Sequence, residues 1–128
     1  MPNFAANLSM MFNEVDFIDR FRIASESGFN AVEYLFPYDY PKEQLVNLLG
    51  ENNLVQVLHN LPAGDWNAGE RGIACHPDRV NEFQESVGLA AEYASALNCP
   101  QVNCLAGIKP ESLLDQEAQD TLVANLMY

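Results

Sequence analysis

The chain has 128 residues, which is enough for one domain with a buried core. Its 48% hydrophobic and 19% charged content indicates a globular protein rather than a disordered one. The net charge of −12 argues against nucleic acid and anionic membranes as partners, because both are bound by clustered lysine and arginine.

The ends and cysteines of the chain predict where the protein resides. No apolar run approaches the ~20 residues of a membrane-spanning helix, and the N-terminus lacks the pattern of a signal peptide. The cysteines, Cys75, Cys99 and Cys104, are odd in number and form no CxxC pair. We therefore expect free thiols in a reducing compartment and a cytoplasmic protein.

Strand-like and helix-like patterns alternate in the first half of the chain. Strands are predicted over residues 4–8, 30–36 and 55–59, and helices over residues 16–27 and from 41 to about 53. Gly28 supplies a stop for the first helix, and Pro41 suits the first turn of the second. The apolar residues expected on the buried helix faces are Phe17, Phe21, Ala24, Leu45, Leu48 and Leu49.

The second half continues the alternation after a long loop over residues 60–79. The third helix, from about residue 80 to 97, carries an apolar stripe of Val80, Phe83, Val87, Ala90, Ala91, Ala94 and Leu97. A strand over residues 101–105 follows. The fourth helix begins near residue 113 or 115, with Ala118, Leu122 and Leu126 on one face. No stop signal follows it, so we expect the chain to end inside this helix, as a truncated domain would.

This alternation predicts an α/β fold with a parallel sheet made of βα units. A doubly wound open sheet and part of a (β/α)8 barrel both fit the pattern. The unfinished last helix favours the barrel. We therefore predict a single domain over residues 1–128 that forms the first half, four βα units, of a TIM barrel.

Ligands of parallel βα folds bind at the carboxyl ends of the strands. His59 ends the third predicted strand, where an imidazole could bind a metal, move a proton or bond a hydroxyl. The long loop that follows contains Trp66, Glu70 and Arg71; Trp66 could cover a small substrate, and Arg71 could bind a carboxylate. The alternative is structural: Glu70 pairs with Arg71, and Trp66 packs on the barrel rim.

Other strand ends offer weaker candidates. Glu33 could be an acid behind the site, but structural pairing with an Arg or Lys elsewhere is the expected role. Asn7 and Asn103 could offer amides to a ligand, and the aromatic residues Tyr34, Phe36, Tyr38 and Tyr40 could line a pocket. Cys75 and Cys104 have no histidine at motif spacing, so a nucleophilic cysteine is not expected. The sequence has no GxGxxG, Walker or HExxH motif and no complete set of metal ligands.

The stretch from Leu58 through His59 and Trp66 to Cys75 reads LHNLPAGDW and then, after one residue, AGERGIAC. These two motifs resemble the hydroxypyruvate isomerase family of xylose-isomerase-like TIM barrels. Residues 4–10, 32–40, 102–107 and 121–126 continue the resemblance in register, so it spans nearly the whole chain.

The resemblance implies isomerisation of hydroxypyruvate to tartronate semialdehyde, or the equivalent step on a 2-oxo-tetronate. Family members pass a proton through an enediol with two glutamates and a divalent metal, Mg²⁺ or Mn²⁺. Those residues lie in the second half of family members, so the resemblance assigns no catalytic residue and no metal ligand here. It assigns substrate contact to His59, Trp66, Glu70 and Arg71.

Three functional hypotheses remain open from the sequence. The first is a piece of such an isomerase, acting on a small keto acid or sugar acid and inactive by itself. The second is a non-catalytic half barrel that forms a homo-oligomer through its exposed strand edges. The third is a keto-sugar epimerase or apurinic-site endonuclease of the same group, the latter disfavoured by the acidic charge.

Overall fold

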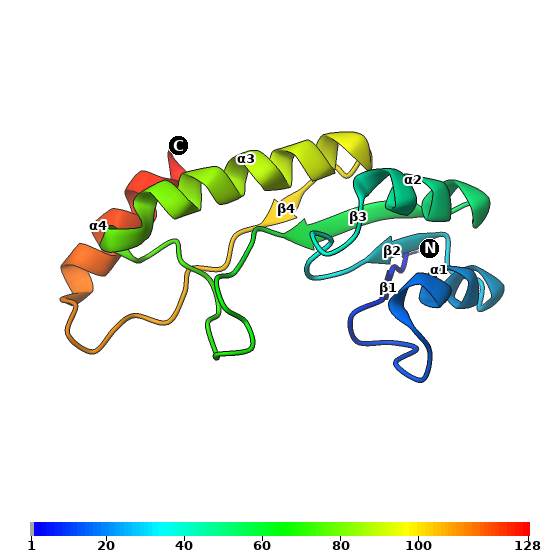
Figure 1. Cartoon of the computed structure of the whole chain (residues 1–128), viewed down its shortest axis with the longest axis horizontal. Helices are drawn as coiled ribbons and strands as arrows, with labels where there is room; N and C mark the ends of the chain where they lie inside the picture. The colour runs from blue at the N-terminus through cyan, green and yellow to red at the C-terminus, as the bar shows by residue number, and fades with distance from the viewer. Residues whose placement is uncertain (1) are drawn as a thin grey trace. The chain divides into compact units, whose positions relative to one another are not determined.

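Strands and helices alternate from end to end in the computed structural model, which describes residues 2–128 (Figure 1). The elements are β1 (Ala6–Asn7), α1 (Phe17–Glu26), β2 (Ala31–Glu33), α2 (Lys42–Glu51), β3 (Val55–Asn60), the short 3-10 helix η1 (Pro77–Arg79), α3 (Val80–Ala96), β4 (Val102–Asn103) and α4 (Asp115–Leu126). Within the described residues, no helix combines the length and apolar composition needed to cross a membrane.

The strands form one sheet in the order β1-β2-β3-β4. β1 pairs with β2 and β2 with β3, both in parallel. The register of β2 and β3 shifts between Val32 and Glu33, so Val32 faces Gln56 whereas Glu33 faces Leu58. The predicted parallel βα units are therefore confirmed, and the neighbouring strands bring their carboxyl ends to one edge.

Two compact units make up the chain. The first comprises residues 1–59 and 92–102, and the second comprises residues 60–91 and 103–128. In the first unit, α1 and α2 pack their apolar faces over the strands. Its core contains Ala6, Leu8, Phe21, Ala24, Val32, Tyr34, Leu45, Leu49, Leu54, Leu97 and Cys99. Phe17 packs its ring edge against Phe21 and Tyr34, with both pairs of ring centroids 5.4 Å apart.

The second unit holds the long loop, most of α3, and α4. Its buried apolar residues include Leu61, Ala63, Ile73, Ala74, Phe83, Ala90 and Ala118. Two hydrogen bonds fasten the loop within the unit: Gly72 N–H donates to Ala63 O at 2.9 Å, and Cys75 N–H donates to Ala106 O at 2.8 Å. Gly72 also forms an antiparallel bridge with Ala106. The loop is thus an ordered part of the second unit.

Some predicted boundaries and faces were wrong. β1, β2 and β4 are shorter than the apolar runs, because strand pairing covers only two or three residues of each. Ala91 is exposed, whereas the polar Ser86 is buried and donates its hydroxyl to Phe83 O. On α4, Leu126 is 61% exposed, and Asn125 takes the buried position by donating to Ala74 O at 2.9 Å.

Candidate functional site

Asn7 and Glu33 meet at the carboxyl ends of β1 and β2. The Asn7 amide Nδ2 donates to Glu33 Oε1 at 2.9 Å. Asn7 Oδ1 accepts the Ser9 N–H at 3.0 Å, and Ser9 Oγ accepts the Leu35 N–H at 2.9 Å. These bonds fix the amide orientation of Asn7, so the Glu33 carboxylate is held in a defined position at the strand ends.

His59, at the end of β3, is completely buried. Gln56 lies between it and Tyr34: the Tyr34 hydroxyl donates to Gln56 Oε1, and Gln56 Nε2 lies 3.0 Å from His59 Nδ1. With the Gln56 oxygen on Tyr34, its amide nitrogen donates to Nδ1, which leaves the ring proton on Nε2. Burial raises the pKa of Tyr34 and keeps its hydroxyl a donor.

The aromatic residues after β2 mostly pack against one another. The rings of Tyr40 and Phe17 stack at 4.9 Å between centroids. Tyr38 sets its ring edge against Tyr93 at 5.2 Å and against His59 at 6.1 Å. The Tyr93 hydroxyl donates to Tyr40 O at 2.8 Å, which ties α3 to the loop after β2 within the first unit. Tyr34 and Tyr40 therefore belong to the core packing, whereas Tyr38 forms one wall around His59.

Glu70 is anchored inside the second unit by Arg79. Nη2 of Arg79 lies 3.2 Å from Glu70 Oε2, Nη1 bonds Oε1, and the Asp65 N–H also donates to this carboxylate. The bond from Arg79 lowers the pKa of Glu70, so Glu70 is ionised at neutral pH. The structural alternative of a Glu70–Arg71 ion pair is wrong, because the partner is Arg79, which also binds Glu82.

Arg71 lies instead against Trp66. Its guanidinium carbon is 3.8 Å from the centroid of the indole ring, a cation–π contact. Nη1 donates to the backbone oxygens of Trp66, at 3.1 Å, and Glu70, at 2.6 Å. Nε and Nη2 bond to no other residue between 2 and 128. An exposed guanidinium is thus held in place with one edge open, and that edge matches the two oxygens of a carboxylate.

Glycine is required at position 72, where the long loop after β3 passes close to the segment after β4. Gly72 has φ +107°, and a Cβ there would lie 2.1 Å from the Leu105 carbonyl oxygen. A hollow of about 220 Å³ lies beside this crossing, lined by residues 68–72, His76 and Ile108. The backbone approach therefore places Arg71 at a small concave surface between the loops that follow β3 and β4, where ligands of parallel βα folds bind.

The remaining polar candidates have structural partners. Asn103 donates to Asn60 Oδ1 at 3.0 Å. Cys75, Cys99 and Cys104 are free thiols, and burial raises the pKa of Cys99 and Cys104, which disfavours a reactive thiolate. Residues 2–128 bring no three His, Cys, Asp or Glu side chains together in the manner of a metal site. The side chains of these described residues therefore do not form a divalent-metal site by themselves.

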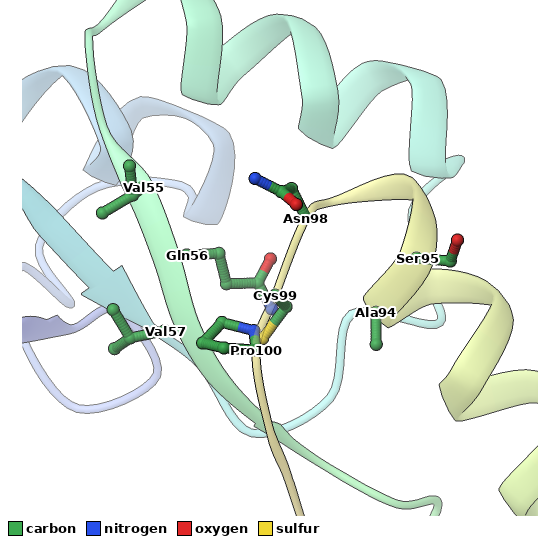
Figure 2. A pocket seen from close by; sticks show the side chains of 8 residues that line it. All are labelled: Val55, Gln56, Val57, Ala94, Ser95, Asn98, Cys99 and Pro100. Atoms are coloured by element: carbon green, nitrogen blue, oxygen red, sulfur yellow. The ribbon is translucent and has the colours of Figure 1, made fainter.

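The larger hollows lie at the opposite ends of the strands. Figure 2 shows one of about 550 Å³ between the start of β3, at Val55–Val57, and the turn that carries Asn98, Cys99 and Pro100. A second, of about 970 Å³, is lined by residues that include Ala5, Ala31 and Val55. Both lie at the amino ends of the strands, whereas the chemistry of parallel βα folds is found at the carboxyl ends. We therefore take as candidates Asn7 with Glu33 in the first unit and, separately, the Arg71 loop in the second unit, rather than these hollows.

Sequence reasoning missed three residues that organise these groups: Ser9, Gln56 and Arg79. Ser9 follows Asn7 by two residues, a spacing typical of an Asx turn. Gln56 is a polar residue inside an apolar strand, which is a signal for a buried hydrogen bond. Arg79 had no such signal, because its pairing with Glu70 spans nine residues of irregular loop.

Comparison with known proteins identifies a family and similar sequences. Residues 21–128 match the family described as xylose isomerase-like TIM barrel. The whole chain is 52% identical to the hydroxypyruvate isomerase of Escherichia coli (strain K12), of which it covers 50%. It is 47% identical to the 2-oxo-tetronate isomerase of Haemophilus influenzae, again covering 50% of that protein. The chain thus spans about half the length of the curated relatives it matches.

A solved structure has the same fold. The crystal structure titled AP endonuclease, family 2 from Brucella melitensis superimposes with a TM-score of 0.94 at 49% identity. The match covers 98% of this chain and 48% of that chain. The predicted half of a TIM barrel and the predicted family resemblance are both confirmed.

Proposed function

Because the chain belongs to the xylose isomerase-like TIM barrel family, we propose that it is part of an isomerase of small 2-oxo acids. The reaction is hydroxypyruvate to tartronate semialdehyde or the equivalent step on a 2-oxo-tetronate, in which a proton passes between adjacent carbons through an enediol. The carrying observation is the in-register match of all 128 residues to relatives named for these two activities.

Arg71 is the residue we propose to bind the substrate carboxylate. Its Nε and Nη2 form the open edge of the guanidinium, and two parallel hydrogen bonds from this edge would fix both carboxylate oxygens. Trp66 covers one face of the guanidinium and keeps it in this orientation. Glu70 acts through the loop: its bonds to Arg79 and the Asp65 N–H hold the backbone that carries Arg71.

His59 is proposed to contact the substrate from the carboxyl end of β3. Gln56 Nε2, 3.0 Å from His59 Nδ1, fixes the orientation of the ring there. The acid/base glutamates and the Mg²⁺ or Mn²⁺ expected for the family are proposed to come from residues outside this chain. A metal bound there would polarise the substrate carbonyl.

The test is conversion of hydroxypyruvate and a 2-oxo-tetronate, with Mg²⁺ or Mn²⁺ added. It is run on the 128-residue chain and on the product of the complete reading frame that contains it. We expect turnover only by the product of the complete reading frame.

In that product, Arg71→Lys should raise KM about 10-fold or more, because one charge remains but the paired hydrogen bonds are lost. Arg22→Lys, at an exposed pair with Glu26, is the matched control. Rapid turnover by the 128-residue chain alone, or an unchanged KM in Arg71→Lys, would contradict the proposal.

Association between copies is a second proposal. β1 and β4 are the outer strands of the sheet, and outer strands carry backbone groups that can pair with another chain. Light scattering over a wide concentration range tests it. A mass that rises from one chain to two supports pairing, and a constant monomer mass contradicts it.

A further inference from the structure

We propose that Glu33, oriented by Asn7, binds the hydroxyl group of the substrate and thereby selects hydroxylated 2-oxo acids. The inference rests on the proposed function, since it concerns the hydroxyl group of the substrate proposed there. The Glu33 oxygen that Asn7 does not occupy would accept a hydrogen bond from that hydroxyl.

The position of Glu33 follows from strand geometry. Val32 and Tyr34 are buried in the core on either side of it. Since successive side chains of a strand point to opposite faces, Glu33 points away from that core. It closes β2 at the carboxyl end, next to the end of β1, which is where parallel βα folds bind ligands.

Glu33 is partly buried, and no lysine or arginine among residues 2–128 bonds to its carboxylate. The chain has six basic residues, and each one has another partner. These are Arg20 (Leu8 O), Arg22 (Glu26), Lys42 (Glu92), Arg71 (Trp66), Arg79 (Glu70) and Lys109 (Asp115). Among residues 2–128, Asn7 alone bonds to the Glu33 carboxylate. The expected pairing of Glu33 with Arg or Lys is therefore wrong within the described chain.

The chemistry of this pair selects the ligand group. An ionised carboxylate accepts hydrogen bonds and donates none, so Oε2 of Glu33 suits a hydroxyl donor. The Glu33 carboxylate would repel the carboxylate of a 2-oxo acid, so the carboxylate end of the substrate would point away from Glu33. Asn7 cannot rotate to compete, because its own oxygen is bound to the Ser9 N–H. The acceptor is thus prepared before a ligand arrives, which lowers the cost of binding.

The experiment compares two ligands that differ only in this hydroxyl. Hydroxypyruvate and pyruvate are titrated into the product of the complete reading frame by calorimetry. We expect hydroxypyruvate to bind at least 10-fold more tightly, because a hydrogen bond to a charged acceptor is lost with pyruvate. Glu33→Gln keeps an oxygen for Asn7 but removes the charge, and it should reduce this preference at least fivefold. Its affinity for pyruvate should change less than twofold.

Two further variants make the outcome decisive. Glu33→Asp keeps the charge but withdraws the carboxylate by one methylene, and it should also lose most of the preference. Glu51→Gln makes the same charge change as Glu33→Gln, but on an exposed residue of α2, and should keep the preference for hydroxypyruvate over pyruvate. If the wild-type protein binds both acids and the preference survives in Glu33→Gln and Glu33→Asp, the role of Glu33 is overturned while the proposed function stands. If the wild-type protein binds neither acid, the proposed function fails, and the inference that rests on it fails too.

Discussion

Arg79 bonds both carboxylate oxygens of Glu70 across the loop that precedes α3. The two residues are nine positions apart, and Arg79 also donates to Glu82 on α3 through Nε and through Nη2, which it shares between the two carboxylates. One side chain therefore joins the loop that presents Arg71 to the first turn of the following helix. The stability of that loop should depend on the charge of Glu70.

Acid should weaken the Arg79–Glu70 ion pair over a defined range of pH. Arg79 holds the pKa of Glu70 below its ordinary value of 4.5, and the unfolded chain restores the ordinary value. The stabilisation is therefore fully present above pH 4.5 and is lost as the pH falls through the lower, folded pKa. Urea unfolding between pH 7 and 3 should show a loss of stability below pH 4.5 that is smaller in Arg79→Met. Arg22→Met, at the exposed Glu26 pair, is the control. Equal acid dependence in wild type and Arg79→Met would exclude this role of Arg79.

Gly72→Ala should destabilise the second unit strongly. The substitution adds strain at φ +107° and places a methyl group 2.1 Å from the Leu105 carbonyl oxygen. We expect the free energy of unfolding to fall by about 3 kcal/mol or more. Gly69→Ala is the matched control: it has φ +97° and open space around the added Cβ, so it should cost only about 1 kcal/mol. Similar losses in the two variants would mean that the close approach to Leu105 contributes nothing.

Gln56→Leu should show how much the buried hydrogen bonds that link Tyr34, Gln56 and His59 contribute to stability. The leucine fills the space but leaves the Tyr34 hydroxyl and His59 Nδ1 without Gln56, which should cost about 2–4 kcal/mol of stability. Adding Tyr34→Phe to Gln56→Leu should recover part of the loss, because one unsatisfied group is removed. Gln44→Leu, on the exposed side of α2, should change stability by less than about 0.5 kcal/mol. Additive losses in the double variant would contradict a shared hydrogen-bond chain.

Gly88→Ala should stabilise the protein. Gly88 is an exposed residue inside α3, and a Cβ there meets no atom within 4 Å. Alanine is favoured over glycine in a helix interior by about 1 kcal/mol, so the midpoint of thermal unfolding should rise. Gly50→Ala, in the last turn of α2 with equally open surroundings, should give a smaller gain. A lower midpoint in Gly88→Ala would indicate that the position contacts something beyond residues 2–128.

Much of the candidate site could be placed in advance, but its internal contacts could not. The rule that ligands bind at strand ends located Asn7, Glu33, His59 and the Arg71 loop before any coordinates. Their roles depended on contacts between distant segments: Glu33 with Asn7 at 26 positions, and His59 with Tyr34 through Gln56. Neither contact leaves a periodic signal in the sequence, because each is made by one polar residue.

The sequence by itself determined the order and type of the elements, because the helical and strand periods of apolar residues are local properties of the chain. It also determined the family, through the long LHNLPAGDW and AGERGIAC segments. Only the tertiary structure decided which cation holds Glu70, since Arg71 next to it is turned onto Trp66 and Arg79 arrives from η1. Only the tertiary structure decided that Glu33 bonds to Asn7 and to no lysine or arginine among residues 2–128, because charge pairing depends on where side chains meet in space.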